Sequence, residues 1–128
     1  MIYVDTSVLL AKLLTEDRRP PRRFWEEGLV SSRLLAYEAW SRVHRRALGS
    51  THGSLLERML ERVAFLELRD DVLARAMEPF PVPVRTLDAL HLSSLAFLAE
   101  RGVRAPLASY DERLVAAARA MRLPIARL

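Results

Sequence analysis

Residues 2–14 read IYVDTSVLLAKLL and set the pattern that the rest of the chain repeats. Ile2 to Val4 is a short apolar run that ends at Asp5, and it predicts a β-strand. Val8 to Leu14 has the apolar content and the length of a helix. A strand that leads directly into a helix is typical of an α/β domain.

Strands and helices continue to alternate along the chain. Strands are expected at Leu29–Ser32, Ala64–Leu68, Pro106–Ser109 and Ile125–Arg127. A short helical turn is expected at Phe24–Glu27, and longer helices are expected at Arg33–Leu48, Leu55–Arg62, from Asp71 to Met77, Thr86–Arg101 and Glu112–Arg122. Ser50–Gly53 is expected to interrupt the helical region. The prolines from Pro79 onward predict irregular structure up to Arg85. Because no two strands are joined by a hairpin turn, we expect a parallel sheet with helices on both faces.

Length and composition limit the class of protein. With 128 residues, of which 51% are hydrophobic and 28% charged, the chain is expected to form a single domain over residues 1–128. It contains no cysteine, which excludes disulfides and thiolate metal sites. The apolar start, Met1–Leu14, lacks a basic leader and is interrupted by Asp5 and Lys12. We therefore expect neither a signal peptide nor a membrane span, and a cytoplasmic location.

The charge balance favours a polyanionic partner. The chain has 20 Lys and Arg against 16 Asp and Glu, a net charge of +4, and a pI near 10.3. Lys12 is the only lysine, and the planar arginine side chain suits bidentate contacts with phosphate. A G+C-rich genome, which favours arginine codons, explains the arginines equally well.

Two aspartates follow predicted strands. Asp5 ends the first strand and Asp111 follows the strand at 106–109. In open α/β sheets ligands bind beyond the carboxyl ends of the strands, so these side chains converge if the two strands are neighbours. Asp5 with Thr6 and Ser7, or Asp111 with Ser109, can also serve simply to cap the helices that follow.

Two further acids lie in apolar helices. Asp88 is surrounded by apolar residues at Leu87, Leu90, Leu92, Leu95, Phe97 and Leu98, and Glu38 lies among Leu34, Leu35, Ala39 and Trp40. A buried carboxylate must be paired, protonated or bound to a cation. Asp88 also fits the first turn of a helix, where the dipole favours negative charge, and Glu38 fits a solvated ion pair with Arg42.

Acids gathered in one cleft repel one another unless cations lie between them. Ligation by oxygen alone is what Mg²⁺ or Mn²⁺ prefers. A metal pair held there would activate water and stabilise the leaving oxygen of a phosphodiester. The acids therefore indicate hydrolytic phosphoryl transfer.

The chain resembles the PIN-domain ribonucleases, and within them the toxins of VapBC-type toxin–antitoxin pairs. The motifs that carry the resemblance are Tyr3-Val4-Asp5-Thr6-Ser7, Glu38, Leu87-Asp88-Ala89-Leu90-His91-Leu92 and Ser109-Tyr110-Asp111. Their order and spacing match over essentially the whole chain. The resemblance implies a three-layer α/β/α fold with a parallel sheet of about five strands in the order 3-2-1-4-5.

The resemblance also implies roles for single residues. Asp5, Glu38, Asp88 and Asp111 would be the catalytic, metal-binding acids for Mg²⁺ or Mn²⁺, and Thr6 or Ser7 would orient Asp5 or a bound water. Ser109 stands where threonine is commoner and keeps the hydroxyl, and the role of Glu112 is open. The family cuts RNA, commonly forms homodimers, and is blocked by an antitoxin that inserts a peptide over the site.

Other polar and aromatic residues can have either a functional or a structural role. His91 lies one turn beyond Asp88, where it would touch substrate or brace the Asp88 carboxylate, although a packed, hydrogen-bonded histidine is expected more often. RNA contacts are expected from Arg18, Arg19, Arg22, Arg23, Arg42, Arg45 and Arg46, unless the last three only form a solvated helix face. Phe24, Trp25 and Trp40 would stack on bases or, as is commoner, pack in the core or a dimer contact. His44, His52 and His91 lack the spacing of a zinc site.

Other classes fit less well. Haloacid dehalogenase-type phosphatases need a second aspartate at position 7, which is Ser7, and receiver domains need a lysine after a late strand, whereas Lys12 lies in the first helix. The glycines are scattered, so no nucleotide-binding loop is present. The open alternatives are a non-catalytic module that binds RNA or protein, and a stand-alone RNA-processing nuclease.

Overall fold

The computed structural model describes residues 1–128, and its centre is a parallel sheet of four strands. The strands are β1 (Ile2–Val4), β2 (Leu29–Ser32), β3 (Val63–Leu66) and β4 (Leu107–Ala108), in the spatial order β3-β2-β1-β4. All neighbouring strands are parallel, which confirms the predicted sheet. Val4 pairs with Ala108, so the carboxyl ends of β1 and β4 meet at one edge.

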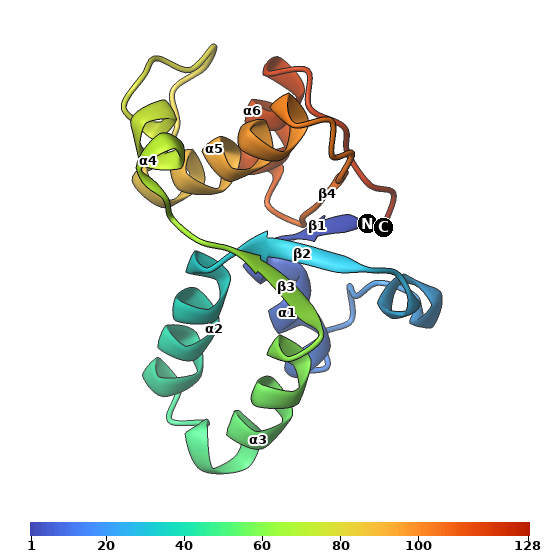
Figure 1. Ribbon diagram of the computed structural model, residues 1–128. Helices are drawn as coiled ribbons and strands as arrows, with labels where there is room; N and C mark the ends of the chain where they lie inside the picture. Colours follow the sequence, from blue (N-terminus) through green and yellow to red (C-terminus); the bar gives the residue numbers. More distant parts are fainter.

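Helices cover both faces of the sheet and form the outer two of three layers (Figure 1). One layer contains α1 (Thr6–Leu13), α2 (Leu34–Arg45) and α3 (Gly49–Leu60), and the other contains α4 (Asp70–Ala76), α5 (Thr86–Glu100) and α6 (Glu112–Ala120). A 3-10 helix, η1 (Arg22–Glu26), precedes β2. None of the helices has both the length and the apolar content that crossing a bilayer requires.

The two faces of the sheet bury two separate hydrophobic clusters. Val4 packs in the cluster on the α1–α3 side, while its neighbour Tyr3 packs with Leu92 and Leu107 on the α5–α6 side. Successive strand residues point to opposite faces, which explains why β1 serves both clusters. The apolar surroundings of Asp88 are therefore those of a core helix, as the sequence indicates.

The predicted fifth strand is reduced to one parallel bridge. Ile125 pairs with Leu107 outside any strand, at the position that the fifth strand would occupy beside β4. Pro106 and Pro124 precede the two bridging residues and have no N–H to donate, so the ladder cannot extend toward the start of either segment. The predicted order holds for the other strands.

Several helix bounds differ from the prediction for local reasons. α1 begins at Thr6 because Asp5 caps it, and α2 ends at Arg45 because Ala47 takes a left-handed conformation, with φ of 55°. The expected interruption at Ser50–Gly53 is wrong, because α3 begins at Gly49. A Cβ at Gly53 would lie 3.3 Å from the Trp40 ring, so this glycine allows α2 and α3 to approach closely and does not break the helix.

Candidate active site

A polar cleft of about 430 Å³ opens at the carboxyl ends of β1 and β4. All four acids singled out from the sequence line it: Asp5, Glu38, Asp88 and Asp111. They come from the end of β1, from α2, from α5 and from the start of α6. The topology therefore gathers four carboxylates that are far apart in the sequence.

The two strand-end aspartates also cap helices. Asp5 accepts from the Ser7 N–H at 3.4 Å, and Asp111 accepts through Oδ1 from the backbone N–H groups of Arg113 and Leu114 at 3.0 and 3.2 Å. The capping interpretation is thus correct for both residues. It does not exclude a second role, because the capped ends point into the cleft.

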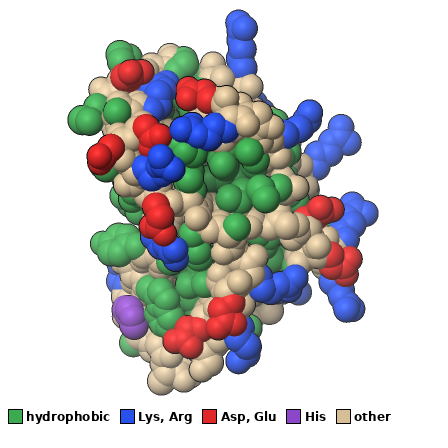
Figure 2. All heavy atoms as spheres, in the orientation of Figure 1, with side chains coloured by type: hydrophobic (Ala, Val, Ile, Leu, Met, Phe, Trp, Pro, Cys, Tyr) green, Lys and Arg blue, Asp and Glu red, His purple; other side chains and the backbone are tan.

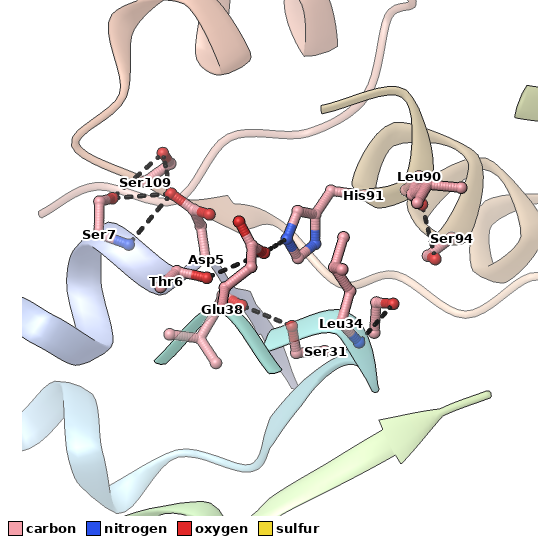
Figure 3. A network of polar contacts seen from close by, with 12 residues as sticks. Asp5, Thr6, Ser7, Ser31, Leu34, Glu38, Leu90, His91, Ser94 and Ser109 are labelled. Carbon is pink, nitrogen blue, oxygen red and sulfur yellow. Dashed lines mark hydrogen bonds and ion pairs between the residues drawn. The ribbon is translucent and has the colours of Figure 1, made fainter. Parts of the chain in front are cut away.

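Two serine hydroxyls hold one oxygen of Asp5. Ser7 Oγ and Ser109 Oγ donate to Asp5 Oδ2 at 2.7 and 2.8 Å (Figure 3). The same hydroxyls accept from the backbone N–H groups of Tyr110 and Asp111, each at 2.9 Å. These N–H donors direct the hydroxyl protons toward Asp5. Asp5 Oδ1 is left without a hydrogen bond from the protein.

Glu38 is held in the same way, through one oxygen. Thr6 Oγ1 donates to Glu38 Oε1 at 3.1 Å, and His91 Nε2 lies 2.5 Å from that oxygen. In Figure 3 the Glu38 carboxylate lies beside Asp5 and faces the imidazole ring of His91. No ion pair with Arg42 forms, so the solvated-pair reading of Glu38 is wrong.

His91 is buried, with 1% of its surface exposed, and does not reach the cleft surface. Its Nδ1 lies 2.7 Å from the hydroxyl of Tyr3, which accepts a bond from the backbone N–H of Ser32 at 3.1 Å. Burial lowers the pKa of His91, but the hydrogen bond to Glu38 and the charges of Asp5, Glu38 and Asp88 outweigh it, so the net pKa is raised. His91 is therefore the packed, hydrogen-bonded histidine that the sequence favoured, and the carboxylate that it braces is Glu38 and not its helix neighbour Asp88.

The surroundings of Asp88 disfavour its ionised form. Its side chain is 19% exposed, and Arg85 Nε lies 3.9 Å away. Burial and the negative charges of Asp111 and Asp5 raise the pKa of Asp88, although Arg85 opposes them. A carboxylate whose pKa is raised by burial and by neighbouring negative charges favours the binding of a cation.

The donor set fits a hard divalent cation. Mg²⁺ and Mn²⁺ take oxygen ligands and commonly keep several waters. No three side chains of the His, Cys, Asp or Glu type are grouped closely enough to enclose an ion by themselves. An ion held in this cleft would therefore complete its ligand shell with water and with substrate oxygens.

The arginines predicted to contact RNA are divided by the structure. Arg18 and Arg42 line the cleft, and Arg19 lines an adjoining groove. Arg22 and Arg23 lie on η1 and Arg45 and Arg46 at the end of α2, away from both. In Figure 2 basic and acidic side chains are interleaved, and no continuous basic face is visible in this orientation.

The aromatic residues serve packing. Phe24 and Trp25 are buried in the cluster beneath α1, and Trp40 packs against that cluster and stacks on His44. The prediction that they pack in the core is correct for these three.

Residues of the site that the sequence did not single out are Tyr3, Glu16, Arg85 and Tyr110. Only Tyr3 left a signal, because a buried tyrosine hydroxyl requires a hydrogen-bond partner.

Comparisons with known proteins agree with this geometry. The model of the PIN domain family matches residues 2–120. The crystal structure of VapC20 from Mycobacterium tuberculosis, described as a Sarcin-Ricin loop cleaving toxin, superposes with a TM-score of 0.66 at 18% identity. The alignment covers 91% of this chain and 95% of that chain. No curated protein matches the sequence significantly.

Proposed function

The chain belongs to the PIN domain family, and on that premise we propose that it is a metal-dependent endoribonuclease, the toxin of a toxin–antitoxin pair. The proposed reaction is hydrolysis of RNA phosphodiester bonds in the cytoplasm. The observation that carries it is the cleft in which Asp5, Glu38, Asp88 and Asp111 meet. The similarity to VapC20, a toxin that cleaves RNA by its description, supports the same reaction class.

The pattern of hydrogen bonds supports a role in metal binding. Asp5, Glu38 and Asp111 each have one oxygen held by protein donors, while the second oxygen makes no hydrogen bond. A carboxylate that is oriented through one oxygen presents the other as a ligand. Mg²⁺ or Mn²⁺ held by the four acids would supply an activated water and stabilisation of the leaving oxygen.

Residues around the four acids orient the carboxylates and attract the substrate. Ser7 and Ser109 fix the direction of the Asp5 carboxylate, and Thr6 and His91 fix that of Glu38. Arg18 and Arg42, at the margin of the cleft, would attract the RNA backbone toward an otherwise acidic site. This division assigns the metal to the acids and the substrate to the arginines.

An RNA cleavage assay tests the proposal. The purified protein is expected to cut end-labelled RNA with Mn²⁺ or Mg²⁺ and to lose this activity in EDTA. Asp5→Asn and Asp88→Asn should abolish cleavage with the fold retained, as checked by circular dichroism. Glu57→Gln, an exposed acid on α3, is the matched control and should cut as wild type does. Cleavage at the wild-type rate by either aspartate variant would refute the proposal.

We propose an antitoxin and a second copy of the chain as partners. The similarity to VapC20, which is described as a toxin, supports the antitoxin. The second copy rests on the sequence resemblance alone. Expression of the chain alone should arrest growth of a host cell, and co-expression of a small neighbouring gene should relieve the arrest. Light scattering of the purified chain should give twice the monomer mass. Metal-dependent cleavage without growth arrest would instead favour a stand-alone RNA-processing nuclease.

A further inference from the structure

A second polar groove, of about 610 Å³, adjoins the acidic cleft. It runs between the segment 17–19, the start of α6 and residues 125–128. Arg18 and Tyr110 line both the cleft and this groove. The two hollows therefore lie side by side with this pair of side chains between them, and a polymer bound in one can extend over the pair into the other.

Arg18 is fixed at the junction of the two hollows without being neutralised. Its guanidinium lies 4.6 Å from the centre of the Tyr110 ring, and it forms no hydrogen bond or ion pair. Stacking on an aromatic face restrains an arginine while leaving its N–H donors available. Tyr110 is itself anchored, because its backbone N–H donates to Ser7 Oγ at 2.9 Å. The cation is thus connected to the same loop that holds Asp5.

A second uncommitted cation lies further along the groove. Arg119 is exposed on α6 and forms no ion pair, although Glu112 and Asp17 also line the groove. Glu112, Val115 and Arg119 share one face of α6. Seven helical residues rise about 10 Å, so the groove extends far enough from the cleft to hold at least one flanking nucleotide.

We propose that this groove, in the following the flank groove, binds the RNA backbone on one side of the bond to be cut. Arg18 holds the phosphate next to the cleft, and Arg119 holds a phosphate further along the strand. The inference rests on the proposed ribonuclease function and assigns the path of the substrate at that site. Glu112, whose role the sequence leaves open, is then a wall of the flank groove and not a ligand in the cleft.

The chemistry of the flank groove favours RNA over a protein segment. Three arginines, Arg18, Arg19 and Arg119, line it against two acids, Asp17 and Glu112, so the side chains of the groove carry a net positive charge, and five of its eleven lining residues are hydrophobic. A larger hollow of about 880 Å³ between α4 and the start of α5 is lined mainly by apolar side chains such as Met77, Phe80 and Val82. That hollow contains a single arginine, Arg85, and lacks the charge to follow a phosphate backbone.

The test is binding of a fluorescein-labelled oligouridylate of twelve nucleotides, followed by anisotropy in EDTA so that no cleavage occurs. Each phosphate contact in a single strand contributes about 0.7 to the slope of log K against log salt. Arg18→Ala and Arg119→Ala should each weaken binding several-fold and lower that slope by about 0.7. The matched control is Arg104→Ala, an exposed arginine before the amino end of β4 that lines neither the cleft nor the groove, and it should bind as wild type does.

The stacking of Arg18 gives a more specific readout. Tyr110→Phe keeps the ring and should bind RNA as wild type does, whereas Tyr110→Ala frees Arg18 and should reproduce most of the loss seen with Arg18→Ala. In cleavage assays with Mn²⁺, Arg119→Ala should raise KM with kcat nearly unchanged, because its contact is equal in the ground and transition states. If Arg119 had a purely structural role, Arg119→Ala would lower the melting temperature of the protein instead.

The possible outcomes separate the flank groove from the ribonuclease proposal. Metal-dependent cleavage together with unchanged RNA affinity and salt slope in both arginine variants would overturn the flank groove and leave the function intact. Altered slopes without cleavage under any metal would support the groove and overturn the function. If wild type binds no RNA, or if the variants lose only the binding of a protein partner, the flank groove is overturned.

Discussion

His91 Nε2 lies 2.5 Å from Glu38 Oε1, and this contact joins α5 to α2 behind the acidic cleft. The two residues are 53 positions apart in the chain. His91 is buried and also contacts the Tyr3 hydroxyl of β1, so one imidazole links three elements. The orientation of a carboxylate in the cleft therefore depends on packing in the core beneath it.

Replacing His91 should loosen Glu38 and weaken metal binding. We expect His91→Gln to lower Mn²⁺ affinity about 10- to 100-fold, the range typical of residues that orient a ligand. Isothermal titration calorimetry measures this directly. His44→Gln, an exposed histidine on α2, is the matched control and should bind Mn²⁺ as wild type does. Unchanged Mn²⁺ affinity in a folded His91→Gln protein would contradict the role assigned to His91.

The same contact predicts a pH dependence of stability. The pKa of His91 is raised in the folded protein by Glu38, Asp5 and Asp88, which outweigh its burial. The stabilisation is therefore fully present below the ordinary histidine pKa of about 6.5 and is lost as the pH rises through the raised value. Thermal melting in EDTA from pH 6 to 9 should show a falling melting temperature in wild type and a flatter profile in His91→Gln. If the melting temperature depended on pH equally in wild type and His91→Gln, the predicted contribution of His91 to stability would be refuted.

Asp88→Asn should stabilise the metal-free protein while abolishing cleavage. Burial and the charges of Asp111 and Asp5 raise the pKa of Asp88, so its ionised form destabilises the fold above the ordinary pKa of 3.8. We expect the melting temperature at pH 7 to rise by about 2–5 °C, which corresponds to roughly 1 kcal/mol in a domain of this size.

Two comparisons check this result for Asp88. The gain should shrink as the pH is lowered through the raised pKa of the folded state and vanish below the ordinary aspartate pKa, where the carboxyl is protonated in both states. Adding Mn²⁺ should raise the melting temperature of wild type and narrow the difference between the two proteins. A destabilised Asp88→Asn protein would mean that its carboxylate is satisfied by Arg85 and needs no cation.

The serine hydroxyls that donate to Asp5 should orient its carboxylate for metal binding. Ser109→Ala removes a donor 2.8 Å from Asp5 Oδ2, and a hydrogen bond to a charged group contributes about 1.5–3 kcal/mol. We expect a lower melting temperature and a loss of Mn²⁺ affinity. Ser109→Thr keeps the hydroxyl and should restore the affinity. If alanine and threonine behave alike in the titration, the hydroxyl does not orient Asp5.

Sequence reasoning found the acids because each violated a simple expectation. Asp5 and Asp111 follow strands whose parallel pairing brings their ends together, and Asp88 and Glu38 lie among apolar residues where a charge needs a partner. The order of the strands followed from the alternation of strands and helices together with the resemblance. These features depend on residue type and spacing, which the sequence contains directly.

What the sequence did not reveal depends on side-chain geometry. The contact between Tyr3 and His91 joins residues 88 positions apart and requires the strand register to be known. The position of Arg18 over Tyr110 depends on how the loop after α1 returns to the sheet. Gly53 resembled a helix break because its close approach to Trp40 is visible only after α2 and α3 pack.

Location of the metal tests the central claim most directly. A crystal of the wild-type protein soaked in Mn²⁺ and measured near the manganese absorption edge should show anomalous density inside the cleft, with carboxylate oxygens from among Asp5, Glu38, Asp88 and Asp111, together with water, as ligands. The peak should vanish in Asp5→Asn crystals grown and soaked in the same way. A cleft without anomalous density at saturating Mn²⁺, or a peak only at other surface acids, would contradict the assignment of these four carboxylates to metal binding.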